Sequence, residues 1–152
     1  MRLEKKVFGK FTRGRKTLSL AESCTGGLIA ERLTNVAGSS AYFLSDVIAY
    51  DNAAKTGILG VPKAVIKKYG AVSRQVACAM AEGARKILKA DVALSTTGIA
   101  GPGGGSQAKP VGLVFIAVST RQKTLVKKFL FKGTRLGIKK QAAETALKIL
   151  AK

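Results

Sequence analysis

The residues that could do chemistry in this chain are hydroxyls, amines and a few carboxylates, because the sequence contains no histidine. Without imidazole, a Ser-His-Asp triad, a Cys-His dyad and any metal site that depends on histidine are excluded. A nucleophile must then take its base from lysine, tyrosine, aspartate or glutamate. Ser23 is the first candidate nucleophile, and Lys55 is the candidate amine.

Ser23 lies where an apolar run gives way to small and polar residues, followed by an amphipathic pattern from Leu28 onward. This order predicts a strand that enters a helix through a tight turn, whose free N–H groups attract anions. The pair Gly26 and Gly27 suits a close approach by a ligand or by another backbone segment. The same pattern is also compatible with Ser23 or Thr25 serving only as a helix N-cap.

Lys55 follows a second apolar run, residues 43–50, and the polar residues Tyr50, Asp51 and Asn52. We expect Asn52 to be an N-cap, which would place Lys55 in the first turn of a helix. A cation is disfavoured at that end of the helix dipole, so the pKa of Lys55 would fall, as a catalytic amine requires. The alternative is an ordinary lysine that points into solvent.

A glycine-rich loop, residues 98–106, follows a predicted strand at residues 91–97 and precedes another at 111–118. Its N–H groups could surround a phosphate or a carboxylate, and a flexible linker is the alternative. Ligands of open α/β sheets gather beyond the carboxyl ends of the strands, where this loop and Ser23 would both lie. Arg135 would begin the last helix, an awkward place for a cation unless it faces an anionic ligand.

Helical and strand patterns alternate along the whole chain. Helices are predicted at 3–12, 26–33, 62–69, 73–89 and 135–151, and strands at 16–22, 43–50, 91–97, 111–118 and 124–131. The last two strands should form an antiparallel hairpin. The expected fold is a single α/β domain over residues 1–152, a three-layer α/β/α sandwich with a mixed, mostly parallel sheet.

Composition narrows the class of protein further. A length of 152 residues with 47% hydrophobic content suits one compact domain, and no apolar stretch is long enough to cross a membrane. The net charge of +19 is spread along the chain without a platform of aromatics, which favours solubility over specific nucleic-acid binding. Cys24 and Cys78 have no disulfide or metal spacing, so a cytoplasmic protein with free thiols is expected.

Four motifs together resemble one family, the CinA C-terminal domain family, which includes free-standing nicotinamide-nucleotide amidases. They are residues 21–27 (Ala-Glu-Ser-Cys-Thr-Gly-Gly), 50–55 (Tyr-Asp-Asn-Ala-Ala-Lys), 70–73 (Gly-Ala-Val-Ser) and 97–106 with 109–112. The resemblance implies hydrolysis of the carboxamide of nicotinamide mononucleotide to nicotinate mononucleotide and ammonia, without a cofactor or a metal. It also implies a homodimer.

The resemblance assigns roles to particular residues. Ser23 would be the nucleophile, Lys55 would take its proton, directly or through Tyr50, and Thr97 and Arg135 would complete the catalytic site. The substrate would be bound by residues of the turn and of two loops: Thr25, Gly26, Gly27, Ser39, Ser40, Gly98, Gly101, Gly103, Gly104, Gly105 and Ser106.

The chain departs from the family pattern at two positions: Thr134 replaces an acidic residue before Arg135, and Asp51 follows Tyr50. Two other classes of function therefore stay open. One is a nucleotide-binding module with little catalysis, which would bind the nucleotide without turnover. The other is a basic nucleic-acid-binding protein, whose affinity would fall steeply with salt and would not depend on Ser23.

Overall fold

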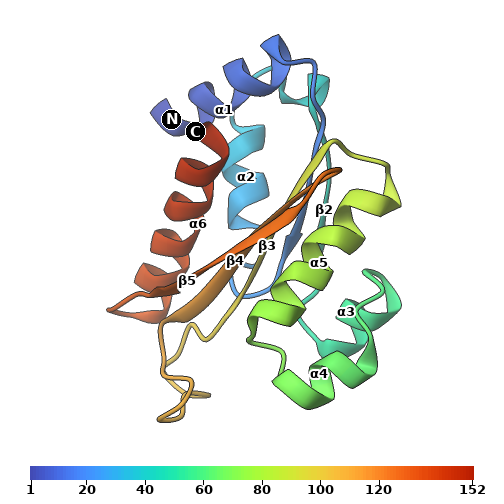
Figure 1. Ribbon diagram of the computed structural model, residues 1–152. Coiled ribbons are helices and arrows are strands. Elements are labelled where there is room, and N and C mark those ends of the chain that lie inside the picture. Colours follow the sequence, from blue (N-terminus) through green and yellow to red (C-terminus); the bar gives the residue numbers. More distant parts are fainter.

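A single five-stranded sheet forms the centre of the molecule, with its strands in the order β2-β1-β3-β4-β5 (Figure 1). The computed structural model describes all residues, 1–152. The strands are β1 (Leu18–Glu22), β2 (Phe43–Ile48), β3 (Val92–Gly98), β4 (Leu113–Thr120) and β5 (Thr124–Leu130). The helices are α1 (Arg2–Arg13), α2 (Leu28–Thr34), α3 (Asn52–Gly57), α4 (Lys63–Tyr69), α5 (Arg74–Ile87) and α6 (Arg135–Ala151), with a 3-10 turn, η1, at Ser39–Ala41.

The sheet is mixed, and most of its strands point the same way. β1 pairs in parallel with both β2 and β3, whereas β4 is antiparallel to both β3 and β5. Only β4 therefore runs against the others, which confirms the predicted mostly parallel sheet and the β4–β5 hairpin. Because β1, β2 and β3 are parallel, their carboxyl ends meet at one edge of the sheet.

Helices cover both faces of the sheet and make the predicted three layers (Figure 1). α1, α2 and α6 pack on one face around a core that includes Leu20 and Leu94. α3, α4 and α5 lie on the other face, where Ala21 and Met80 belong to a second core. All five residues of β1 are buried, because this central strand is covered on both faces and its side chains alternate between the two cores.

Two predicted boundaries around the site are wrong. The helix expected to begin at Gly26 begins at Leu28, because Gly26 and Gly27 have φ of +59° and +97° and form the turn itself. The strand expected to reach Tyr50 ends at Ile48. Both errors arise where the chain turns at the carboxyl edge of the sheet, so the turns there are longer than the pattern indicates.

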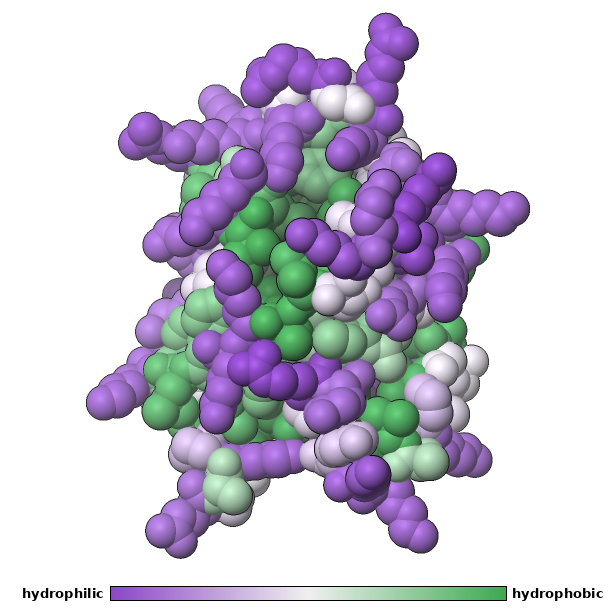
Figure 2. Space-filling view, viewed as in Figure 1, coloured by the Kyte–Doolittle hydropathy of each residue, from purple (hydrophilic) through white to green (hydrophobic).

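The chain carries 27 lysine and arginine residues against eight aspartate and glutamate residues, so the protein is strongly basic. Hydrophilic side chains project around the whole outline in the space-filling view (Figure 2). None of the helices combines the length and the apolar composition needed to cross a bilayer.

Candidate active site

Ser23 lies at the carboxyl end of β1, in the turn that leads to α2. Its backbone N–H donates to the carbonyl of Thr96 on β3 at 3.1 Å, so the sheet pairing continues to the first residue of the turn. The Ser23 side chain is largely buried, with 8% of the residue exposed. The predicted strand-turn-helix arrangement around Ser23 is therefore confirmed.

Glu22, the last residue of β1, holds the start of α2 in place. The N-cap of α2 is Gly27, which has no side chain to accept from the first free N–H groups. The Glu22 carboxylate takes this role, because its two oxygens accept from the N–H groups of Ile29 and Ala30, each at 3.1 Å. A buried carboxylate on the strand thus fixes the helix relative to the turn that carries Ser23.

Thr25, predicted to bind substrate, faces the protein interior. Its hydroxyl lies 2.5 Å from Glu22 Oε1 and 2.8 Å from Thr96 Oγ1, and the residue is fully buried. These bonds stabilise the turn from inside. Its side chain therefore supports the geometry of Ser23 and does not reach the cavity.

Lys55 is 2% exposed, and its amine contacts Ser23 directly. Lys55 Nζ lies 3.1 Å from Ser23 Oγ, 2.9 Å from the carbonyl oxygen of Ala49 and 3.2 Å from that of Tyr50. The predicted alternative, a lysine pointing into solvent, is wrong. The structure brings the candidate nucleophile and the candidate amine together.

The reason expected for a lowered Lys55 pKa is wrong, although the direction is as predicted. α3 is capped by Asp51, whose side chain accepts from the N–H of Ala53, and not by Asn52. Lys55 consequently lies in the last turn of this short helix. Burial lowers the pKa of Lys55 below its ordinary value of 10.5, and the Asp51 carboxylate and Cys24 oppose that shift only in part.

The three contacts of Lys55 match a neutral amine. A neutral amine has two N–H donors and one lone pair, and it is surrounded here by two carbonyl acceptors and one hydroxyl. With both N–H groups directed to the carbonyls of Ala49 and Tyr50, the lone pair faces Ser23. This arrangement allows Lys55 to accept the Ser23 proton.

A cavity of about 210 Å³ opens in front of the Ser23–Lys55 pair. Its lining comes from the ends of β1 and β3, from the segment before α5 and from the starts of α3 and α6: Ser23, Cys24, Tyr50, Asn52, Lys55, Ala71, Val72, Thr97, Gly98, Ala100 and Arg135. The five predicted catalytic residues all line it. Among the predicted substrate-binding residues, only Gly98 does.

Tyr50 and Arg135 are linked to each other beside the cavity. Arg135 donates to the Tyr50 hydroxyl and to the carbonyl oxygen of Gly101, both at 2.7 Å. The Tyr50 side chain is 60% exposed. Its hydroxyl bonds to Arg135 and not to Ser23 or Lys55, so the direct Lys55 contact leaves no need for a relay through Tyr50.

Thr97 and the segment before α5 form another wall of the cavity at Ser23. The Thr97 hydroxyl donates to the carbonyl oxygen of Ala71 at 2.8 Å. Ser73 caps α5 as predicted, since its hydroxyl accepts from the N–H of Val76. The motif at residues 70–73 thus places Ala71 and Val72 against the cavity, a role that the sequence pattern did not indicate.

Several predicted substrate-binding residues lie away from the cavity. Ser39 and Ser40 belong to η1, next to the amino end of β1, because the Leu18 N–H bonds to the Tyr42 carbonyl there. They are consequently at the edge of the sheet opposite Ser23.

The tip of the glycine-rich loop is also outside the cavity. Gly103, Gly104, Gly105 and Ser106 are exposed. Gly101 touches the site only through its carbonyl oxygen, which accepts from Arg135. Of the turn glycines, Gly26 is exposed near the amine of Lys139, and its positive φ is what the turn requires, whereas Gly27 also lies against the side chain of Ile48.

Sequence patterns missed the role of Glu22 at the start of α2 and the place of Asn52 in the cavity wall, since Asn52 was expected only as an N-cap. Only the acidic residue at the end of β1 offered a signal, since a carboxylate is unusual in a buried strand. Cys24 also lines the cavity, but burial raises the pKa of its thiol to about 12, so a thiolate nucleophile is disfavoured. The structure contains no cluster of three or more histidine, cysteine, aspartate or glutamate side chains that could hold a metal ion.

Comparisons with known proteins identify the family of the chain. The model of the CinA C-terminal domain matches residues 1–152. A CinA-like protein of Geobacter sulfurreducens is 56% identical over 131 residues, which are 86% of this chain and 32% of that protein. A CinA-like protein of Desulfotalea psychrophila is 55% identical over 134 residues, which are 88% of this chain and 32% of that protein.

The fold matches a solved structure described as the competence/damage inducible protein CihA of Agrobacterium tumefaciens, with a TM-score of 0.95 and 44% identity. The match covers 98% of this chain and 92% of that one. The chain spans about a third of the length of the two CinA-like relatives above. With the family model matching every residue and these relatives covering most of the sequence, the chain belongs to the CinA C-terminal domain family.

Proposed function

We propose that this domain is a serine amidase that hydrolyses the carboxamide of nicotinamide mononucleotide to nicotinate mononucleotide and ammonia. The observation that carries the proposal is the 3.1 Å contact between Ser23 Oγ and Lys55 Nζ, in a chain that has no histidine. The family and the residues around the cavity support the substrate, which the resemblance implies.

In the first half of the reaction, Ser23 Oγ attacks the carboxamide carbon while Lys55 accepts the Ser23 proton. The resulting tetrahedral intermediate collapses when Lys55 returns the proton to the nitrogen, and ammonia leaves. An ester between Ser23 and the nicotinoyl group remains.

In the second half, water attacks this ester, with Lys55 again accepting a proton and then returning it to Ser23 Oγ. Nicotinate mononucleotide is released, and the site returns to its starting state. The negative oxygen formed in both halves needs donors, and the backbone N–H groups of Cys24 and Thr25, which bond to no protein acceptor, are the candidates. The Gly26 N–H is not available for this role, because it bonds to the Ser23 carbonyl.

Ammonia release from nicotinamide mononucleotide by the unaltered protein and by Ser23→Ala tests the proposal. We expect turnover by the unaltered protein and loss of at least about a thousandfold in Ser23→Ala. Thr34→Ala is the matched control, because it removes an exposed hydroxyl at the far end of α2. No ammonia from folded unaltered protein, or equal rates with and without the Ser23 hydroxyl, would refute the amidase.

The homodimer implied by the resemblance stays a prediction. Sedimentation of the protein over a range of concentrations would test it, and a monomer at all concentrations would contradict it.

A further inference from the structure

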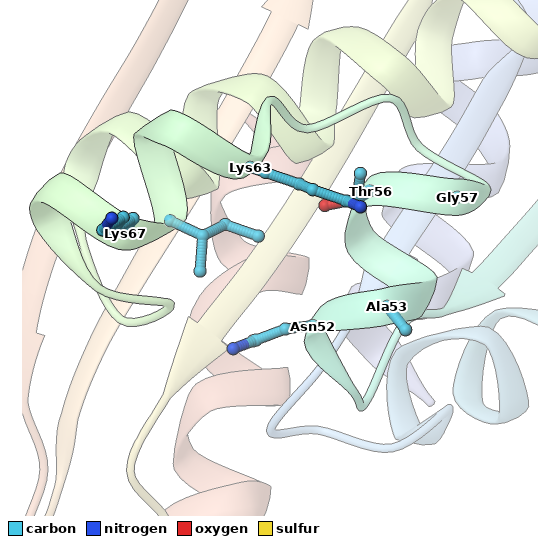
Figure 3. Close-up of a pocket in the computed structure, with 7 residues that line it drawn as sticks. Asn52, Ala53, Thr56, Gly57, Lys63 and Lys67 are labelled. Carbon is cyan, nitrogen blue, oxygen red and sulfur yellow. The ribbon is translucent and has the colours of Figure 1, made fainter.

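A second cavity lies beside the candidate active site, between α3 and α4 (Figure 3). Its volume is about 500 Å³, and its lining consists of Asn52, Ala53, Thr56, Gly57, Lys63, Ile66 and Lys67. Asn52 also lines the smaller cavity that contains Ser23 and Lys55. The two cavities therefore adjoin at the first residue of α3. We call this second cavity the α3–α4 groove.

The α3–α4 groove is bordered by positive charge. Lys63 and Lys67 lie one turn apart on α4, and neither forms an ion pair with a carboxylate. No acidic residue lines the groove. Figure 3 shows Lys63 reaching from α4 toward Thr56 on α3, while Asn52 and Lys67 flank the other part of the cavity. Two unpaired ammonium groups beside one hollow favour an anionic ligand.

The smaller cavity is too small for a whole nucleotide. Pockets that enclose such ligands have volumes of about 300–1,000 Å³, and the cavity at Ser23 has about 210 Å³. A carboxamide that reaches Ser23, together with the ring attached to it, would fill this cavity. The rest of the ligand must therefore lie in a neighbouring space.

Other cations around Ser23 are less available for a phosphate. The guanidinium of Arg135 already donates to Tyr50 and Gly101. The exposed tip of the glycine-rich loop, to which we first assigned the phosphate, does not line the cavity. The α3–α4 groove shares Asn52 with the cavity and carries two lysines that form no ion pair.

We propose that the α3–α4 groove binds the phosphate of a nucleotide whose amide lies at Ser23, with Lys63 and Lys67 as the phosphate-binding residues. This inference rests on the proposed amidase function and makes the enzyme selective for phosphorylated substrates. Both lysines are exposed, so their attraction for phosphate is screened by salt.

The test compares nicotinamide mononucleotide with nicotinamide riboside, which lacks the phosphate. In the double variant Lys63→Ala/Lys67→Ala, we expect KM for the mononucleotide to rise about tenfold to a hundredfold, with kcat little changed. The rate with the riboside should stay the same. Restoring the charge, as Lys63→Arg/Lys67→Arg, should recover most of the mononucleotide affinity.

The control variant is Lys5→Ala/Lys6→Ala, which removes the same charge from exposed positions on α1, at the opposite end of the molecule (Figure 1). It should leave both substrates unaffected. An equal change for both substrates in the α4 double variant, or no change for either, would overturn the groove assignment while leaving the amidase intact.

Calorimetric titration with nicotinamide mononucleotide separates failure of the groove from failure of the amidase. If the unaltered protein releases no ammonia, the amidase is refuted, and binding then decides the groove. Binding that is lost in Lys63→Ala/Lys67→Ala would support the groove as a nucleotide site. No binding by the unaltered protein, or equal binding by the double variant, would overturn it.

Discussion

Asp46→Asn should stabilise the protein at neutral pH, although it replaces an acidic side chain on the edge strand β2 that the folded protein shields from solvent. Asp46 lies on β2 opposite Leu20 of β1, so its side chain is on the same face of the sheet as Glu22. Both Asp46 carboxyl oxygens are shielded from solvent and have no hydrogen-bond partner in the folded protein. The Glu22 carboxyl is the acidic neighbour of Asp46, so we infer that the two acids hold one proton between them.

Asp46 is the member that carries this proton. Glu22 already accepts from the N–H groups of Ile29 and Ala30 and from the Thr25 hydroxyl, so its oxygens are occupied as acceptors. Two causes raise the pKa of Asp46 from 3.8 to about 9. Burial is the larger cause, and the neighbouring Glu22 carboxyl is the second. The folded protein thus holds a proton that the unfolded chain releases.

The sign of the effect on stability follows from proton binding. Between about pH 4 and pH 9 the folded state binds one more proton at Asp46 than the unfolded state, so the free energy of unfolding falls as pH rises. The slope is about 1.4 kcal/mol per pH unit. At about pH 7.5 the accumulated cost is about 5 kcal/mol, and below about pH 4 it vanishes.

Asparagine keeps the shape and can donate its amide N–H to Glu22 without taking up a proton. The second amide N–H is then buried without a partner, which costs about 1–3 kcal/mol. We therefore expect the free energy of unfolding to rise by a net amount of about 2–4 kcal/mol at about pH 7.5. Urea unfolding of both proteins at several pH values measures it. The difference should shrink toward acidic pH, because the Asp46 contribution is then fully present.

Glu22→Gln is the matched control, since it makes the same chemical change in the other member of the pair. It turns an amide N–H toward the N–H donors of α2 and should destabilise the protein by about 1–3 kcal/mol. Parallel pH slopes for Asp46→Asn and the unaltered protein would refute the shared proton. A loss of stability in Asp46→Asn near pH 7.5 would refute it as well.

Three further predictions concern the base, the caps and the packing of the helices. Because burial lowers the pKa of Lys55, kcat/KM for the amide should rise with pH through an apparent pKa below 10.5, and a flat profile from about pH 6 to 10 would contradict a lysine base. Thr134→Ala removes the side chain that accepts from the Gly137 N–H at the start of α6, so thermal unfolding should show a loss of about 1 kcal/mol, and an unchanged melting temperature would show that the cap is dispensable. Gly83→Ala should destabilise by about 1–3 kcal/mol despite the better helix propensity of alanine, because its Cβ would overlap the Leu59 carbonyl oxygen, and a more stable variant would contradict that contact.

Much of the fold could be predicted because its signals are local. The alternation in β5 indicated the hairpin, and Ser73 indicated the start of α5 by its cap. The turn after β1 was predictable for the same reason: an apolar strand, small residues and an amphipathic helix follow one another directly. The two departures from the family pattern also have local roles, since Asp51 and Thr134 are the N-caps of α3 and α6.

Features that depend on contacts distant in sequence could not be predicted in the same way. Lys55 lies in a polar stretch with no periodic sign that its amine is buried against Ser23, which is 32 residues away. The position of Ser39 and Ser40 depends on which end of β1 they meet, and small polar residues carry no information about that. The shared proton of Asp46 and Glu22 requires the β1–β2 register, which only the assembled sheet defines.

Lys55→Met gives the most direct test of the Ser23–Lys55 pair, because methionine fills similar buried space without an amine. The measurement is the rate of ammonia release from nicotinamide mononucleotide by this variant and by the unaltered protein, with circular dichroism to establish that both are folded. We predict a fall in kcat of about 10²–10⁴-fold, the usual contribution of a general base, with KM changed little. A folded Lys55→Met protein that retains kcat within about threefold of the unaltered protein would contradict the role of Lys55 as the base.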